Sequence, residues 1–225
     1  MVVEFGETID PAIQQRAIAL ADALDAASPR GLVETVPTYR STLIEYDPER
    51  TDPARLLSAL PATDGSAGTD RARHWSVAVC LEGEMAEDLA ELASRLAMPE
   101  EEVRARLLGS ELRVGMYGFA PGFAYCYGLD PALAVPRRAT PRPPMPVGSL
   151  IVAAGQAGFS PVSLPTGWYV AGRTPARLFD AEAAAAGLVP VPFGLGDRLS
   201  LRAVDVAAFE ALRARPADAV VELDG

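Results

Sequence analysis

Three arginines lie close together between prolines in the stretch PRRATPR, residues 136–142. Arginine side chains bind carboxylates and phosphates through two parallel hydrogen bonds. The prolines keep the segment extended and lower the entropy lost on binding. In a chain whose net charge is −10, Arg137, Arg138 and Arg142 therefore predict an anion-binding site. The alternative is that they pair with surface Asp or Glu and contribute little.

A glycine- and aromatic-rich stretch, GFAPGFAYCYGL, precedes these arginines at residues 118–129. Its glycines permit a positive φ or a close approach of another group to the backbone. Such a loop can present backbone N–H groups to an anion. We expect it to form a pocket wall, in which Gly122 leaves room where a Cβ would intrude. Its predicted substrate-binding residues are Phe119, Gly122 and Tyr125.

A second motif, at residues 153–180, carries further polar groups. Gln156 is an amide among small residues and can both donate and accept hydrogen bonds. Residues 166–168 predict a tight turn into a strand. Arg173 is a fourth arginine, for which a bracing role and a substrate role are equally open. We predict that Gln156 acts with the three arginines in catalysis, and that the substrate also contacts Gly158, Thr166, Trp168 and Arg173.

Residues that the chain lacks exclude several chemistries. There is no lysine, and therefore no Schiff-base, phosphate-loop or biotin-carrying lysine. His74 is the only histidine, so no site of two histidines can be built, and we predict that it is structural. Cys80 and Cys126 lack metal-site spacing and are predicted to be small buried residues, and we expect no metal. The acidic charge argues against nucleic acid and membrane partners.

The elements that position these residues fall into two predicted domains. Residues 1–66 predict an α+β domain with strands at 1–5, 32–36 and 41–46. Asp10-Pro11 and Asp52-Pro53 are helix-start signals, and apolar residues follow the first one at helical spacing. This βαββα order predicts a ferredoxin-like fold.

The remainder of the chain predicts a compact β barrel, residues 74–225. Small polar residues form a linker before it, which we place at 67–73. A strand at 75–81 and helices at 86–96 and from Pro99 come first. Short apolar runs then alternate with Gly and Pro clusters, and a helix follows at 205–212. With no apolar run of about 20 residues and no basic-then-apolar leader, we expect a cytoplasmic protein with reduced thiols.

The motifs also resemble one protein family in their order and spacing. They are GFAPGFAYCYGL, PRRATPR, PVGS, GQAGFSP, GWYVAGRTPARLFD and GLGDRLSL, with VPTYRSTLIEYDP near the N-terminus. The family contains allophanate hydrolase subunit 1, the sporulation-kinase inhibitor and the B subunit of 5-oxoprolinase, and forms half of the urea carboxylase carboxyltransferase domain. The resemblance implies a C-terminal cyclophilin-like β barrel and an active site shared with a homologue of subunit 2 or of the C subunit. This chain differs from the family pattern at Leu107, Gly155, Ser160, Leu164 and Thr166.

Three functions fit this resemblance. In the first and favoured one, the chain is one subunit of an ATP-dependent 5-oxoprolinase that opens 5-oxoproline to L-glutamate, together with a C-subunit homologue and a lactam-hydrolase-type A-subunit homologue. The three arginines would stabilise developing charge. ATP would bind through the assembled complex, since the chain lacks a GxxxxGK[ST] loop. The second is an allophanate hydrolase or carboxyltransferase subunit that acts on urea-derived amides with a biotin-bearing partner. The third is a non-catalytic histidine-kinase inhibitor.

Overall fold

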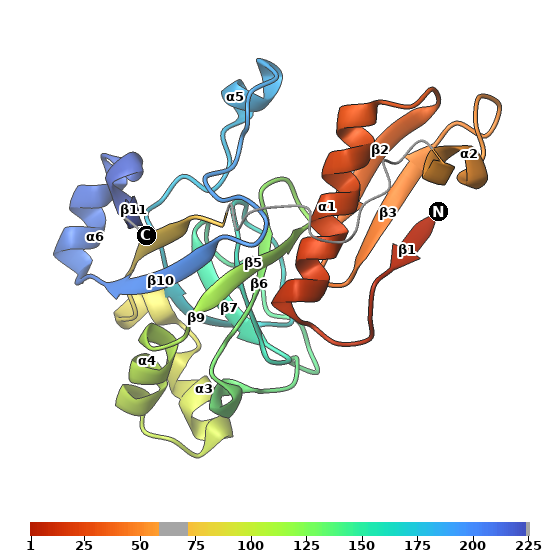
Figure 1. Cartoon of the computed structure of the whole chain (residues 1–225). Helices are drawn as coiled ribbons and strands as arrows, with labels where there is room; N and C mark the ends of the chain where they lie inside the picture. The colour runs from red at the N-terminus through yellow and green to blue at the C-terminus, as the bar shows by residue number, and fades with distance from the viewer. Residues whose placement is uncertain (59–71, 224–225) are drawn as a thin grey trace. The chain divides into compact units, whose positions relative to one another are not determined.

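The computed structural model describes residues 1–58 and 72–223. Contacts divide the chain into two compact units, Met1–Arg71 and Ala72–Gly225 (Figure 1). Of the linker predicted at residues 67–73, residues 67–71 lie outside the described residues.

The first unit packs helices against a three-stranded antiparallel sheet. Its strands are β1 (Val2–Glu4), β2 (Leu32–Pro37) and β3 (Ser41–Tyr46), in the order β1-β3-β2. Helix α1 (Pro11–Ala27) follows β1, and α2 (Pro53–Ser58) follows β3. The element order is the βαββα order that the sequence predicts.

Helix α1 begins where the sequence places its cap. The Asp10 carboxylate accepts hydrogen bonds from the backbone N–H groups of Ala12 and Ile13, at 2.8 and 3.3 Å, which satisfies two of the free donors of the first turn. Ala17 and Leu24 are fully buried on the sheet side of the helix. The Thr42 hydroxyl donates to the Ala17 carbonyl oxygen at 2.7 Å, so that a buried polar group of the sheet is satisfied by the helix.

The second unit contains an eight-stranded sheet in the order β11-β4-β10-β5-β6-β8-β7-β9. Strands β4 and β10 are parallel, and the other pairs are antiparallel. The strands are β4 (His74–Val79), β5 (Leu112–Tyr117), β6 (Ala124–Tyr127), β7 (Ser149–Ala153), β8 (Gln156–Phe159), β9 (Tyr169–Arg173), β10 (Arg198–Ala203) and β11 (Val220–Leu223). The helices are η1 (Gly83–Ala86), α3 (Leu89–Leu96), α4 (Glu100–Leu108), η2 (Pro131–Leu133), α5 (Ala181–Ala185), α6 (Val206–Arg213) and η3 (Pro216–Ala219).

The mixed α+β class is confirmed. The predicted compact β barrel is not confirmed, because among the described residues no ladder closes the sheet. Strand β9, at one end of the sheet order, contacts the other end of the sheet only at Cys80, just beyond β4. There Arg173 and Cys80 exchange two backbone hydrogen bonds, of 2.8 and 2.9 Å. The pairing stops at this single bridge because the chain enters η1 at Gly83.

The core of the second unit lies between the sheet and helices α3 and α4. Leu107, where the family pattern differs, is fully buried in this core. Cys80 and Cys126 are buried and unbonded to each other, as predicted. His74 lies at the start of β4, and its Nε2 is 2.8 Å from the Ser200 hydroxyl.

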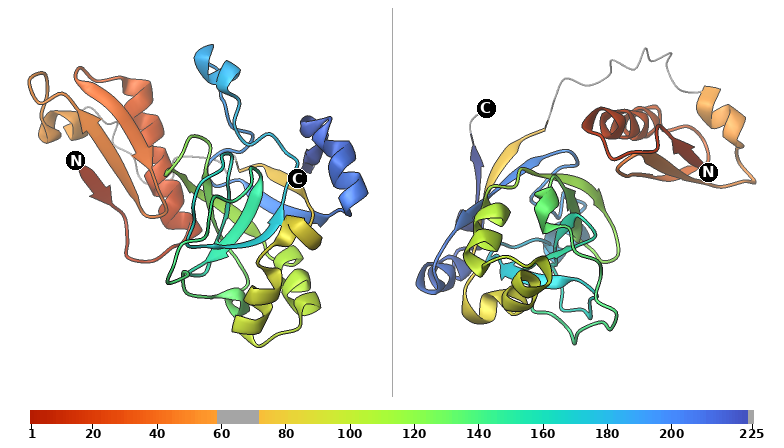
Figure 2. Two further views of the ribbon diagram at one scale, coloured as in Figure 1. Left: turned by 180° about the vertical axis from the view of Figure 1, so that it is seen from behind. Right: turned by 90° about the horizontal axis from the view of Figure 1, so that it is seen from below.

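Helix α5 is the exception to this packing, because it lies on a projection that stands off from the sheet (Figures 1 and 2). Across residues 1–58 and 72–223, each helix is too short or too polar to cross a bilayer.

Candidate functional site

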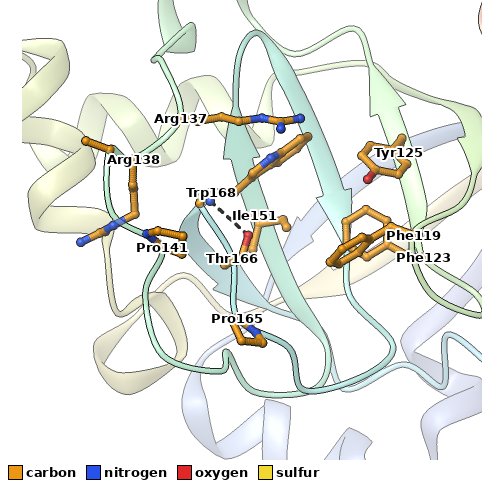
Figure 3. A pocket seen from close by; sticks show the side chains of 12 residues that line it. Phe119, Phe123, Tyr125, Arg137, Arg138, Pro141, Ile151, Pro165, Thr166 and Trp168 are labelled. Carbon is orange, nitrogen blue, oxygen red and sulfur yellow. Dashed lines mark hydrogen bonds between the residues drawn. The ribbon is translucent and has the colours of Figure 1, made fainter.

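A cavity of about 430 Å³ opens beside β6 and β7 of the second unit (Figure 3). This volume falls within the range of small-molecule sites, roughly 300–1,000 Å³. Six predicted site residues line it: Phe119, Tyr125, Arg137, Arg138, Thr166 and Trp168. The other lining residues are Phe123, Ala139, Pro141, Ile151, Pro165 and Gly167.

Aromatic rings form one continuous wall of this cavity. The ring centroids of Phe119 and Phe123 are 5.6 Å apart, those of Phe123 and Tyr125 are 4.6 Å apart, and those of Tyr125 and Trp168 are 5.9 Å apart. Burial raises the pKa of Tyr125 above its usual value, and nearby Arg137 only partly opposes this. Tyr125 therefore remains protonated at neutral pH and can donate a hydrogen bond to a ligand.

Phe119 is held at the rim of the cavity in an unusual conformation. Its φ is +68°, a region that bulky residues rarely adopt, and its side chain is 68% exposed. Strain of this kind concentrates at binding and catalytic sites.

Gly122 supports the same loop but does not make room for a ligand. Its φ is +76°, and an added Cβ would lie 2.8 Å from the Phe179 Cβ and 2.9 Å from the Leu178 carbonyl oxygen. The space that its missing side chain leaves is therefore occupied by this chain's own backbone and by Phe179. We predicted a substrate contact at this position, and the structure places a packing contact there.

Arg137 is the cavity's available cation. Its guanidinium carbon lies 5.7 Å from the centre of the Trp168 ring, and the side chain extends over that ring toward Tyr125 (Figure 3). Within residues 1–58 and 72–223, Arg137 forms no ion pair. A cation over an aromatic face, exposed at a cavity and without an acidic partner, is suited to bind a ligand anion.

Arg138 turns in the opposite direction (Figure 3). One of its guanidinium nitrogens lies 2.7 Å from the Glu91 carboxylate and 3.3 Å from the Asp88 carboxylate. Its guanidinium also lies 5.1 Å from the centre of the Tyr169 ring. Only part of the side chain therefore lines the cavity, and its charge is directed at acids of α3 and the residue before it.

Arg142 and Arg173 also form ion pairs with acidic residues. Arg142 forms an ion pair with Asp88 at 2.7 Å and a second one with Glu87. Arg173 lies 3.4 Å from Glu87. Neither arginine lines the cavity. For Arg138 and Arg142, the alternative of pairing with acidic residues describes the observed contacts. For Arg173, the contact with Glu87 is of the kind that the bracing alternative implies.

These pairs are more than surface contacts, because Asp88 joins them to the sheet. Its side chain is only 11% exposed, and that of Arg142 only 13%. The Asp88 carboxylate also accepts a hydrogen bond from the Val170 N–H at 2.8 Å, and its own N–H donates to the Val170 carbonyl at 3.0 Å. Asp88 thus ties the arginine segment to β9. We call Glu87, Asp88, Glu91 and their three arginines the ionic network.

The arginine segment runs alongside the turn at residues 164–168. The Arg138 N–H donates to the Gly167 carbonyl at 2.7 Å, and the Arg142 N–H donates to the Thr166 carbonyl at 2.8 Å. The Thr166 hydroxyl oxygen accepts from the Trp168 N–H at 3.1 Å, which sets the turn that leads into β9. This pairing holds Arg137 opposite the Trp168 ring.

Gly158 and Gln156 lie on β8. A Cβ on Gly158 would lie 3.1 Å from the tip of the Phe123 ring, so this glycine lets the aromatic wall lie against the sheet. Strand alternation puts Gln156 on the same face as Gly158, but Gln156 is not among the residues that line the cavity.

Sequence reasoning missed the acids of the ionic network. Glu87 and Asp88 precede Glu91 by four and three residues, which places all three on one side of a helical segment. That spacing could have indicated an acidic stripe. Arg142 lies 54 residues beyond Asp88 and Arg173 lies 86 residues beyond Glu87, so only the fold could pair them.

The first unit and most of the second, including the cavity of aromatic residues and arginine, belong to a known class. The family model of the carboxyltransferase domain, subdomain C and D, matches residues 1–189. The chain is a member of this family.

Within the family, the chain is similar to named subunits of 5-oxoprolinase. It is 31% identical over 192 residues to the B subunit of 5-oxoprolinase from Bacillus subtilis (strain 168), an alignment that covers 80% of each chain. It is 31% identical over 178 residues to the B subunit of 5-oxoprolinase from Haemophilus influenzae, covering 76% of this chain and 81% of the relative.

Solved structures share the fold. The protein TTHA0988 aligns with a TM-score of 0.78 and 35% identity over 91% of this chain, which spans only 40% of TTHA0988. Protein PH0987 from Pyrococcus horikoshii aligns with a TM-score of 0.57 and 30% identity, covering 92% of this chain and 95% of PH0987. Urea carboxylase from Kluyveromyces lactis has a TM-score of 0.71 at 17% identity, covering 99% of this chain and 23% of the carboxylase, and supports the fold alone.

Proposed function

We propose that this chain is the B-type subunit of an ATP-dependent 5-oxoprolinase, which opens 5-oxoproline to L-glutamate. Similarity to the B subunits of known 5-oxoprolinases over about four fifths of the chain supports this function. The structural observation that carries it is Arg137, a cation without an acidic partner among the described residues, above an aromatic floor in a cavity of about 430 Å³.

The cavity fits the chemistry of 5-oxoproline, a small ring with one carboxylate and one lactam carbonyl. Arg137 binds the carboxylate through charge-assisted hydrogen bonds. The ring packs on the aromatic wall that includes Trp168. Tyr125, whose pKa is raised by burial, stays protonated and donates a hydrogen bond to the lactam oxygen, where negative charge develops.

The composition of the cavity also supports a shared active site. In the part of the chain that the structure describes, the residues that line it include no carboxylate, imidazole, thiol or lysine, so these residues supply no such general base for the attack of water. We propose that a C-subunit homologue supplies the missing groups and that a lactam-hydrolase-type A-subunit homologue completes the complex. ATP, bound in that complex, would transfer its γ-phosphoryl group to the lactam oxygen and leave as ADP; water would then open the activated ring and release phosphate.

Finer features of the fold fit the same proposal. The β1-β3-β2 order of the first unit supports a ferredoxin-like domain. The two hydrogen bonds between Cys80 and Arg173 support an incompletely closed, cyclophilin-like barrel in the second unit. We also propose a cytoplasmic location, which matches the two reduced, buried cysteines.

Carboxyl transfer to a urea-derived amide is the second candidate, favoured by the carboxyltransferase name of the matching family. It requires a separate biotin-bearing partner. Inhibition of a histidine kinase is a third role that the same cavity could serve without chemistry.

The test is glutamate release from 5-oxoproline and ATP by the chain alone and with its A-type and C-type partners. Turnover is expected only in the complex. Arg137→Ala should lower kcat/KM about 10- to 100-fold, because a hydrogen bond to a charged group contributes about 1.5–3 kcal/mol. The control, Arg213→Ala, removes an arginine whose side chain is 68% exposed and should change little.

Three results would count against this function. Robust turnover by the chain alone would refute the shared site. Carboxyl transfer with a biotinylated partner, without lactam opening, would favour the second candidate. Tight binding to a histidine kinase, with no turnover in any combination, would favour the third.

A further inference from the structure

A short arm, residues 180–190, projects from the second unit and carries α5. At its base the Asp180 N–H donates to the Pro190 carbonyl oxygen at 2.8 Å, which closes the arm as a loop. Figures 1 and 2 show it standing off from the sheet in views from opposite sides.

The arm has a defined internal structure. The Asp180 carboxylate accepts from the N–H groups of Glu182 and Ala183, at 3.0 Å each, and pairs with Arg177 at 3.0 Å. The Leu188 N–H donates to the Ala183 carbonyl at 2.9 Å. An element that is already ordered loses little entropy when it binds.

The tip of the arm is apolar and exposed. Leu188 is 65% exposed and Val189 is 81% exposed, the highest value among the large apolar side chains of residues 1–58 and 72–223. The residues of α5 and Ala186 beside them are also largely exposed. Adjacent apolar side chains on a projecting element mark a protein-binding surface.

The charges near the tip indicate the kind of surface that it fits. Between residues 178 and 196 the only charged side chains are Asp180 and Glu182. The whole chain carries a net charge of −10. A second copy would bring the same acidic arm and the same net charge, which is repulsive. A partner with an apolar socket and a basic rim is complementary.

The root of the arm contacts the cavity loop. At Gly122 an added Cβ would lie 2.8 Å from the Phe179 Cβ and 2.9 Å from the Leu178 carbonyl, so the backbones pack directly. Phe119 and Phe123, which flank this glycine, both line the cavity. The base of the arm therefore lies beside the loop that forms the rim of the cavity.

A longer relative indicates which protein that is. This chain spans only 40% of TTHA0988, so in TTHA0988 the same fold is joined to a further body within one polypeptide. A separate chain that corresponds to this remainder is the natural counterpart here.

We propose that the arm inserts Leu188 and Val189 into an apolar, basic-rimmed socket on the partner chain homologous to the remainder of TTHA0988, and so holds that chain beside the cavity. This inference rests on the proposed function, because the partner is the C-type subunit of that proposal. The inference goes beyond the proposed function because it assigns the arm as the element that contacts this subunit.

The experiment measures binding of the purified partner chain from the same organism by isothermal titration calorimetry. Leu188→Asp/Val189→Asp should raise Kd at least tenfold. The matched control is Val206→Asp, a change of the same kind on α6 at a valine that is 44% exposed, and its Kd should match wild type. Thermal melts establish that each variant is folded, and Leu188→Ala/Val189→Ala replaces the first variant if it is not.

The outcomes separate this inference from the proposed function. Equal affinity of wild type, arm variant and control overturns the arm proposal and leaves the function standing. Failure of the wild-type chain to bind overturns both. Self-association of the chain that the arm variant abolishes makes a second copy the occupant, and overturns the proposal as well.

Discussion

Replacing Asp88 with asparagine is expected to destabilise the second unit strongly, although only a charge is removed. The asparagine oxygen can still accept from the Val170 N–H, now 2.8 Å from the carboxylate. The charge opposite Arg142, at 2.7 Å, and opposite Arg138, at 3.3 Å, is lost. Both arginines are mostly buried, with side chains 13% and 22% exposed, and water cannot fully replace the carboxylate.

The expected magnitude follows from these contacts. Removing one partner of a fully buried pair costs about 3–5 kcal/mol, and the remaining Glu87 and Glu91 pairs reduce that figure. We expect Asp88→Asn to lower the free energy of unfolding by about 2–3 kcal/mol. For a unit of this size, each kcal/mol shifts Tm by about 2–4 °C, so Tm should fall by roughly 5–10 °C.

Thermal and urea unfolding measure this loss. The control is Asp218→Asn, which removes the carboxylate of a surface pair with Arg215 whose side chains are 52% and 71% exposed. That change should cost less than about 0.5 kcal/mol. A Tm for Asp88→Asn within the error of the control would refute the argument that the ionic network braces the cavity wall.

Three further results are expected. Arg137→Lys should recover little of the activity lost in Arg137→Ala, because lysine cannot form the two parallel bonds of a guanidinium; full recovery would show that only charge is needed. His74→Gln should leave the activity of the complex within a few-fold of wild type, since the histidine contacts Ser200 at 2.8 Å and not the cavity, whereas a loss of about 100-fold in a folded variant would indicate acid–base catalysis. Burial raises the pKa of Cys126 from 9.0 to about 12, so its contribution to stability is complete below pH 9 and is lost as the pH rises toward 12. Urea unfolding at pH 8 and pH 10 should therefore show a larger loss for wild type than for Cys126→Ala, and equal losses would contradict the burial argument.

Local signals predicted much of the fold. Asp10 was expected to cap a helix, and its carboxylate accepts a hydrogen bond from a backbone N–H of the first turn. The turn at residues 166–168 leads into β9 as expected. These features depend on neighbours within a few residues, which a sequence displays directly. The strand order, including the near return of β9 to β4, was not predictable in this way.

For Gly122, the residue type predicted the backbone conformation but not the group that packs against it. Its positive φ was anticipated from residue type, and the structure has it at +76°. The group that needs the space is Phe179, more than fifty residues away in sequence, and not a substrate. A sequence pattern can indicate that there is no room for a Cβ at this position. Which atom would clash with that Cβ depends on the tertiary fold.

By itself, the sequence determined that four arginines and a set of aromatic residues recur in motifs typical of one family, that the chain has no lysine, and where several helices begin. The tertiary structure decided which arginine is available. Arg138, Arg142 and Arg173 are paired with Glu87, Asp88 and Glu91, whereas Arg137 lies over Trp168 at the cavity. The physical reason is that a guanidinium binds whichever carboxylate the fold brings within about 4 Å, and the folded chain brings these acids to three of the four from about fifty or more residues away.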